Sequence, residues 1–228
     1  NQSSAASDVY KRQVSTPSFY HKKNNSASVA ICVPVRDNVT AVFAYSLAML
    51  QRKCGEAGLA TSLHFIMGSE VTMQRQQLVS EALETNCTHI MWIDSDMQFP
   101  VDTLNILLAA DKDIVAGNYS TRVPPHRPVA FRSKNNLDDR VFTGTGLEKV
   151  WAVGSGMMLV KRKVYEKLSS PFYKIEFLDE YSSLVGEDVY FCTKANEAGY
   201  EVYVSHELSD KIAHIGTRAF TVKGDCND

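Results

Sequence analysis

Short apolar runs alternate with amphipathic segments along the first half of the chain. Residues 29–35 form a compact run of β-branched and small apolar side chains, which predicts a buried strand. A polar loop follows, and the spacing of apolar positions then predicts a helix over about 39–53. The same order recurs with a strand over 62–67 and an amphipathic helix that ends near residue 84. The chain therefore begins as two strand–helix units.

A third and a fourth predicted strand continue this alternation. They span 90–93 and 114–117. Between them, Asp102 is the expected N-cap of a helix whose apolar face includes Leu104 and Leu107. Parallel strands joined by helices form a sheet that is covered on both faces. The pattern predicts an α/β fold with a parallel, Rossmann-like sheet.

The pattern changes after residue 118. Prolines and arginines over 119–136 favour an extended segment over a pocket, not a helix. The other predicted elements are short strands over 141–142 and 150–153 in a small mixed or antiparallel part, a strand over 157–160, a helix over 161–168, a loop over 182–186, a helix over 187–198, and strands over 202–204 and 212–213. We expect a flexible N-terminal arm over 1–27 and a single domain over 28–228.

Composition and charge narrow the classes of partner. The formal net charge of the 228 residues is -2, and no basic block marks a surface for nucleic acid. No apolar run approaches the roughly 20 residues of a membrane span, and no apolar signal core is present, so we expect a cytoplasmic protein. Five scattered cysteines without a Cys-x-x-Cys pair are interpreted as reduced. Small-molecule chemistry is the better expectation.

Two carboxylates follow the third predicted strand. Asp94-Ser95-Asp96 comes directly after the apolar run 90–93, where parallel strands usually present ligand groups. Both acids are able to approach one hard cation and its phosphate ligands. An isolated Asp-x-Asp also suits a turn that ends a strand, and the rest of the chain has to decide between the two interpretations.

Further acidic and imidazole groups lie at the ends of later elements. His214 follows a predicted strand and with Asp96 would give an oxygen and a nitrogen ligand for Mg²⁺ or Mn²⁺. A structural histidine is the alternative, and His206 competes with His214 as a ligand. Glu187 and Asp188 open a predicted helix, where carboxylates either stabilise the helix N-terminus or act as a general base.

Taken together, these residues resemble the GT-A glycosyltransferases, in particular the family 2-like inverting enzymes and small viral members that build chlorovirus capsid glycans. The resemblance covers about residues 29–220. The motifs that carry it are Val-Pro-Val-Arg at 33–36, Trp-Ile-Asp-Ser-Asp-Met at 92–97, Gly-Ser-Gly-Met-Met-Leu-Val at 154–160, Gly-Glu-Asp-Val-Tyr-Phe-Cys at 186–192 and His-Ile-Gly at 214–216. Each motif is weak alone, but their order and spacing are specific.

The resemblance implies a role for each matching residue. Asp96 matches the metal-binding acid, His214 the further metal ligand, and Asp188 the base that deprotonates the acceptor, with Glu187 beside it. The implied cofactor-binding positions are Pro34, Arg36, Arg75, Asp94, Ser95, Asp96, Gly154 and Gly156. Two departures, Met67-Gly68-Ser69-Glu70 in place of an Asp-Asp-Gly-Ser turn and Gln76 in place of Asn, put base recognition in doubt.

The predicted function is transfer of a sugar from a nucleotide-diphosphate sugar, a UDP-sugar by preference, to a glycan hydroxyl with inversion. The implied cofactor is Mn²⁺ or Mg²⁺, the partners are the donor and the acceptor glycan, and the location becomes the host cytoplasm if the protein is viral. A sugar nucleotidyltransferase remains an alternative, although residues 33–38 lack its Gly- and Lys-rich phosphate loop. A non-catalytic module that binds nucleotide sugars or glycans is the other alternative.

Overall fold

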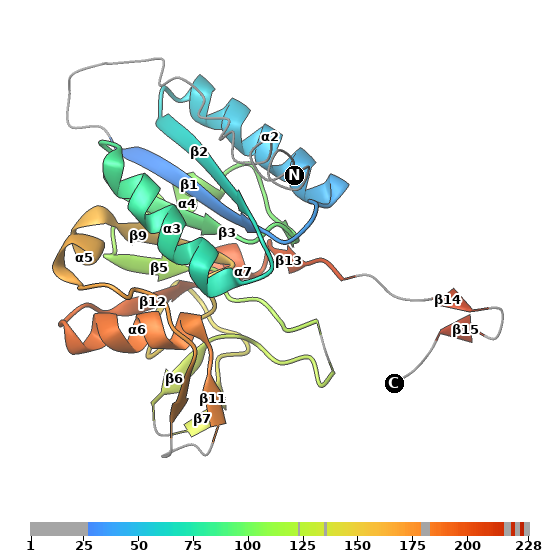
Figure 1. Cartoon of the computed structure of the whole chain (residues 1–228). Coiled ribbons are helices and arrows are strands. Elements are labelled where there is room, and N and C mark those ends of the chain that lie inside the picture. The colour runs from blue at the N-terminus through green and yellow to red at the C-terminus, as the bar shows by residue number, and fades with distance from the viewer. Residues whose placement is uncertain are drawn as a thin grey trace, which may run out of the picture.

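A seven-stranded sheet lies at the centre of the computed structural model, with helices on both faces (Figure 1). The structure describes residues 27–122, 124–134, 136–178, 183–216, 220–221 and 224–225. The predicted arm over 1–27 therefore lies outside the described residues, except for its last position. The mixed α/β architecture confirms the predicted fold class.

The sheet is mostly parallel. In spatial order its strands are β2 (Ala60–Met67), β1 (Ser28–Val35), β3 (His89–Ile93), β9 (Met157–Lys161), β5 (Ile114–Ala116), β12 (Val202–Ser205) and β8 (Leu147–Val150). β8 runs antiparallel to β12, and β9 runs antiparallel to both β3 and β5. Because β9 is reversed, its first residues lie at the same edge as the last residues of β1, β3, β5 and β12.

Three helices cover each face of the sheet. Buried side chains of α3 (Val71–Glu84), α5 (Arg162–Lys167) and α6 (Glu187–Glu197) pack in one core cluster. Those of α2 (Ala41–Glu56), α4 (Thr103–Ala109) and α7 (His206–Ser209) pack in the other. Alternation along β1 explains the two layers, since Ala30 and Cys32 join the first cluster while Ile31 and Val33 join the second.

Helix starts follow local capping chemistry. The Thr40 hydroxyl accepts a hydrogen bond from the Phe43 amide, so α2 begins at Ala41 rather than at the predicted residue 39. The Glu70 carboxylate accepts from the Thr72 amide and begins α3. Asp102 occupies the N-cap of α4 as predicted, although its side chain makes no capping hydrogen bond.

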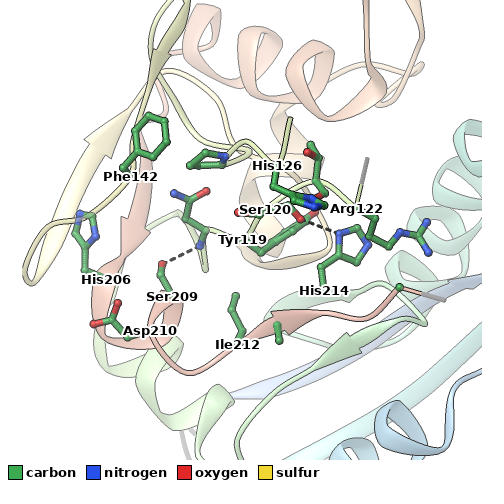
Figure 2. A pocket seen from close by; sticks show the side chains of 15 residues that line it. Tyr119, Ser120, Arg122, His126, Phe142, His206, Ser209, Asp210, Ile212 and His214 are labelled. Carbon is green, nitrogen blue, oxygen red and sulfur yellow. Dashed lines mark hydrogen bonds between the residues drawn. The ribbon is translucent and has the colours of Figure 1, made fainter. Parts of the chain in front are cut away.

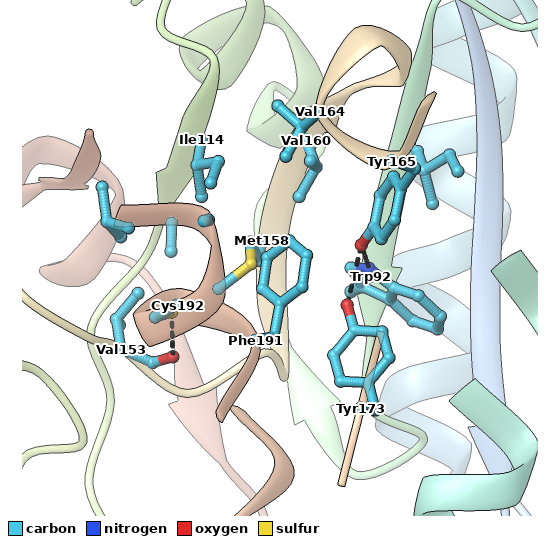
Figure 3. Close-up of a cluster of buried hydrophobic side chains, with 14 of the residues drawn as sticks. Trp92, Ile114, Val153, Met158, Val160, Val164, Tyr165, Tyr173, Phe191 and Cys192 are labelled. Atoms are coloured by element: carbon cyan, nitrogen blue, oxygen red, sulfur yellow. Dashed lines mark hydrogen bonds between the residues drawn. The ribbon is translucent and has the colours of Figure 1, made fainter. Parts of the chain in front are cut away.

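An aromatic cluster supports the sheet edge that carries the acidic residues. The Trp92 indole N–H donates to the Tyr165 hydroxyl at 2.8 Å, and the Tyr165 and Tyr173 hydroxyls are 2.7 Å apart (Figure 3). Phe191 of α6 stacks on both tyrosine rings. These contacts fix the start of α6 against the end of β3, two segments that are far apart in sequence.

Several predictions for the second half are wrong in detail. The predicted loop over 182–186 contains β11 (Ser183–Val185), which pairs with β10 (Glu176–Leu178). No strand forms at 141–142, because the hairpin of β6 (Phe131–Ser133) and β7 (Asn136–Arg140) ends before it. The strand predicted over 150–153 is β8 and ends at Val150. Lys161 ends β9 instead of starting a helix. A short β14 (Phe220–Thr221) pairs with β15 (Gly224–Asp225) near the C-terminus.

No helix within the described ranges combines the length and the apolar character that crossing a bilayer requires.

Cys32, Cys54, Cys87 and Cys192 are free and buried, which confirms the prediction for these four thiols, whereas Cys226 lies outside the described residues.

Candidate functional site

Five of the eight residues predicted to bind the donor line one small cavity at the strand ends, whereas Arg75, Gly154 and Gly156 are not among its lining residues. Its volume is about 260 Å³. The lining residues are Pro34, Arg36, Gly68, Ser69, Val71, Gln74, Asp94, Ser95, Asp96, Arg122 and His214. The loops after β1 and β3 contribute most of the residues that sequence patterns selected, because both strands end at this edge. Gln74, Arg122 and the 68–71 turn were not among the predicted site residues.

A short strand pair brings His214 to Asp96. β13 (Ala213–His214) pairs with β4 (Met97–Gln98), so that His214 lies opposite Met97. The Ile215 amide also donates to the Asp96 carbonyl at 2.8 Å. The His214 Nε2 atom is 3.3 Å from Asp96 Oδ1. The two proposed metal ligands are therefore close enough to share one cation.

The tautomer of His214 follows from its other contact. Its Nδ1 is 3.0 Å from the Ser120 carbonyl oxygen, which only accepts, so Nδ1 carries a hydrogen. In the neutral ring the Nε2 lone pair then faces Asp96. Two acceptors in contact repel each other unless a cation lies between them. A proton or a metal ion satisfies this requirement.

The neighbours of Asp96 and His214 change the pKa of both side chains. Burial lowers the pKa of His214, but the hydrogen bond and charge of Asp96 outweigh burial and raise it above its ordinary value. Burial raises the pKa of Asp96, but His214 and Arg122 outweigh it and lower the pKa overall. Arg122 Nη1 lies 2.8 Å from Asp96 Oδ2. One oxygen of this carboxylate thus faces an imidazole and the other faces a guanidinium.

Asp96 and His214 suit a divalent cation whose other coordination positions are filled by ligands that are not protein side chains. Within the described ranges, no three or more His, Cys, Asp or Glu side chains are placed to hold one metal ion. One carboxylate and one imidazole leave the remaining octahedral positions to phosphate oxygens and water, as Mg²⁺ and Mn²⁺ prefer at nucleotide sites. Asp96 and His214 are the residues that would hold it.

A buried arginine joins three other acidic side chains behind the cavity. Arg75 of α3 is 2% exposed, and its Nη2 lies 2.9 Å from Asp94 Oδ1. Its Nε lies 3.4 Å from Glu187 Oε1, and Nη2 lies 3.8 Å from Asp188 Oδ1. The guanidinium also lies over the Trp92 ring, 5.2 Å from its centroid. Arg75 is not among the described residues that line the 260 Å³ cavity, and its ion-pair partners are the three carboxylates.

Asp188 has the strongest sign of a general base. Burial and the adjacent charge of Glu187 raise the pKa of Asp188 to about 7, although the positive charge of Arg75 opposes this rise. The side chain is 27% exposed, yet its Oδ1 is buried and has no hydrogen bond within the described structure. One oxygen therefore faces Arg75, and the exposure belongs to the rest of the side chain. A carboxyl with a pKa near neutrality suits proton abstraction.

Gly154 and Gly156 make room for protein atoms. A Cβ at Gly156 would lie 2.5 Å from the Tyr119 hydroxyl and 2.7 Å from Asp94 Oδ2, and one at Gly154 would lie 2.6 Å from the same hydroxyl. The Gly156 amide donates to that hydroxyl at 2.9 Å. Tyr119 was not predicted as a site residue, and its position three residues after the end of β5 was the available signal.

A larger cavity of about 730 Å³ lies beside the first (Figure 2). It shares Arg122 and His214 with the small cavity, while Asp94, Asp96 and Asp188 are not among its lining residues. His206 lies across this larger cavity from His214. Its Nε2 is 2.8 Å from Glu148 Oε2, so His206 has a partner of its own and does not compete for Asp96. The predicted chemistry is therefore centred on the smaller cavity.

Comparison with known proteins bears on the fold. The crystal structure of A197 from STIV matches with a TM-score of 0.53 and 16% sequence identity, and the match covers 86% of this chain and 97% of that chain. No family model and no curated protein matches the sequence. At this identity the likeness shows the fold alone. The chain has a mixed α/β fold, with a mostly parallel central sheet flanked by helices, compatible with the Rossmann-like GT-A class.

Proposed function

We propose that this protein is a glycosyltransferase that moves a sugar from a nucleotide-diphosphate sugar, preferably a UDP-sugar, to a glycan hydroxyl with inversion. The observation that carries the proposal is the grouping of acidic residues at one sheet edge. Asp96 faces His214 at 3.3 Å beside the small cavity, and Arg75 links Asp94 at the same strand end to Asp188. A cation site and a base of near-neutral pKa are the two parts that such a transfer needs.

The proposed step has a simple balance of bonds. Asp188 takes the proton of the acceptor hydroxyl, and the acceptor oxygen forms a bond to the anomeric carbon of the donor sugar. The bond from that carbon to the diphosphate oxygen breaks, and its electron pair leaves with the nucleoside diphosphate. Attack opposite the leaving group inverts the anomeric centre, and no covalent enzyme intermediate is required.

Different residues of the site have different proposed roles in this step. Asp96 and the Nε2 of His214 would hold the divalent cation, which supplies positive charge to the diphosphate when it is bound. The Ser120 carbonyl orients the imidazole through Nδ1. Arg75 keeps Glu187 and Asp188 at fixed positions near Asp94. The cavity lined by Pro34 and Arg36 is the proposed place for the nucleotide.

A panel of nucleotide sugars tests the proposal. The protein is incubated with Mn²⁺ and each donor, with and without oligosaccharide acceptors, and release of nucleoside diphosphate is measured. We expect slow release from a UDP-sugar without acceptor and faster release with the correct one, and the anomeric proton coupling of the product reports inversion. Binding without release would instead support a binding module. Formation of pyrophosphate from UTP and a sugar phosphate would support a nucleotidyltransferase.

Binding of Mn²⁺ should depend on pH through His214. Protonated His214 must lose its proton before Nε2 can bind a metal, and its raised pKa places this titration above the ordinary histidine range. Below that pKa, we expect the affinity for Mn²⁺ to fall by about tenfold per pH unit. Titration of Mn²⁺ by electron paramagnetic resonance measures the effect.

Two substitutions separate His214 from the other imidazoles. His214→Gln should weaken Mn²⁺ binding and remove most of its pH dependence. His126→Gln is the matched control, because His126 also lies beside the larger cavity and its Nδ1 also contacts a backbone carbonyl, that of Thr121. An unchanged pH profile in His214→Gln would remove this residue from the metal site.

A further inference from the structure

Arg122 lies where the two cavities meet. It is among the residues that line both the 260 Å³ and the 730 Å³ cavity, and its side chain is 50% exposed. Its Nη1 is 2.8 Å from Asp96 Oδ2, while the other oxygen of Asp96 faces His214. The stem of Arg122 lies near Gly216, from the segment that follows β13. Figure 2 shows Arg122 and His214 side by side at this end of the larger cavity.

This arrangement places a guanidinium on the carboxylate that is proposed to bind a divalent cation. A cation with two charges at Asp96 would repel a guanidinium held at hydrogen-bond distance from the same carboxylate. The Arg122 side chain is 50% exposed and that of Asp96 is 22% exposed, so the guanidinium is able to leave Asp96 for water or for another anion within the cavity once a cation holds the carboxylate. A planar guanidinium binds two phosphate oxygens at once, which makes a diphosphate its natural next partner.

The other arginines near the site are less suited to this exchange. Arg75 is buried among carboxylates. Arg36 lines the 260 Å³ cavity, but its side chain is 83% exposed. Its ion-pair partner within the described structure is the neighbouring Asp37. Among the arginines that the structure describes, Arg122 is the one with an ion pair to a proposed metal ligand.

We propose that Arg122 is the internal counter-ion of Asp96 in the ligand-free protein and becomes a ligand of the donor diphosphate when a divalent cation takes its place. The inference rests on the proposed function for the identity of the diphosphate. Arg122 and the cation therefore compete for Asp96 in the absence of nucleotide, and they act together once the diphosphate is present. Arg122 therefore weakens binding of the cation alone and strengthens binding of the diphosphate.

Two binding affinities that should change in opposite directions test this role. The substitution Arg122→Met keeps an unbranched apolar stem at this position and removes the guanidinium with its charge. Without nucleotide, we expect this variant to bind Mn²⁺ about threefold to tenfold more tightly than the wild type. With saturating Mn²⁺, we expect it to bind UDP and inorganic pyrophosphate about tenfold more weakly. Isothermal titration calorimetry measures all three affinities without any need for catalysis.

Arg127→Met is the matched control. Arg127 belongs to the same segment and is 49% exposed, but its partner is Asp138 at 3.1 Å, away from Asp96. All three affinities should equal those of the wild type in this variant. Equal or weaker Mn²⁺ binding by Arg122→Met, or unchanged binding of UDP and pyrophosphate, would overturn the exchange.

The same titrations distinguish this inference from the proposed function. Wild-type protein that binds Mn²⁺ and pyrophosphate but no nucleoside diphosphate would contradict the glycosyltransferase proposal, while the opposite shifts in Arg122→Met would still support the exchange. Wild-type protein that releases UDP from a UDP-sugar, together with unchanged affinities in Arg122→Met, would support the function and contradict the role of Arg122.

Discussion

Replacement of Asp188 by asparagine should lower sugar transfer by roughly a thousandfold, within the range that a lost general base produces. The amide keeps the shape of the side chain but cannot take the acceptor proton. UDP and Mn²⁺ should bind as in the wild type, because Asp188 is not among the residues that line the donor cavity. Steady-state transfer rates and binding titrations on the same samples measure both effects.

The control for this variant is Glu197→Gln, which removes a carboxylate from the exposed end of the same helix. Its transfer rate should match that of the wild type, and both variants should unfold near the wild-type temperature. Transfer at the wild-type rate by Asp188→Asn would exclude this residue as the base.

The pKa of Asp188 also predicts how activity and stability change with pH. A carboxyl with a pKa of about 7 is ionised, and so active as a base, only as the pH rises through that value. Because the pKa is raised in the folded state, the protonated form contributes stability that is present below the unfolded-state pKa near 4 and is lost as the pH rises through about 7. Between these values, activity should increase while this contribution to the free energy of unfolding decreases.

Replacement of Arg75 by methionine should destabilise the fold by about 3–5 kcal/mol, the range for removing one partner of a buried ion pair. Asp94, Glu187 and Asp188 would then repel one another without a positive charge between them. Urea unfolding at pH 8 measures the loss, which should become smaller at pH 5, where protonation relieves the repulsion. Transfer should fall as well, since the three carboxylates would no longer be held together.

Two further variants keep this prediction testable. Arg52→Met removes an exposed arginine that pairs with Glu56 within α2, and its effect should stay below about 1 kcal/mol. If Arg75→Met does not fold, the triple variant that adds Glu187→Gln and Asp188→Asn should restore folding, because it removes two of the uncompensated charges. Equal unfolding free energies for Arg75→Met and Arg52→Met would contradict the role of Arg75.

The grouping of the proposed donor-binding residues could be predicted from sequence because it depends on local order along the chain. Pro34 lies near the end of an apolar run that predicts a buried strand, Arg36, Asp94 and Asp96 follow such runs, and parallel strands bring their ends to one side of the sheet. Their common cavity follows from that rule. The roles of these residues stay predictions, since the structure gives their positions and not their ligands.

The remaining features depend on contacts between distant segments. No periodicity in the sequence indicates that β9 runs against its neighbours, or that the pairing of β4 with β13 brings His214 to Asp96. Arg75 was assigned to the donor side by resemblance, but its burial among three carboxylates emerges only when α3 and α6 pack on the same face. Tyr119 and Arg122 belong to a proline-containing segment whose path has no regular pattern to read.

The reversed strand β9 also determines when the sheet is able to form during synthesis. β9 is the strand that hydrogen-bonds to both β3 and β5, so β3 and β5 each have an edge without its partner strand until β9 has left the ribosome. Unpaired edges are the places where nascent strands associate with other chains. The acidic edge is therefore assembled late, and delays in translation between β5 and β9 should increase aggregation more than delays after β9.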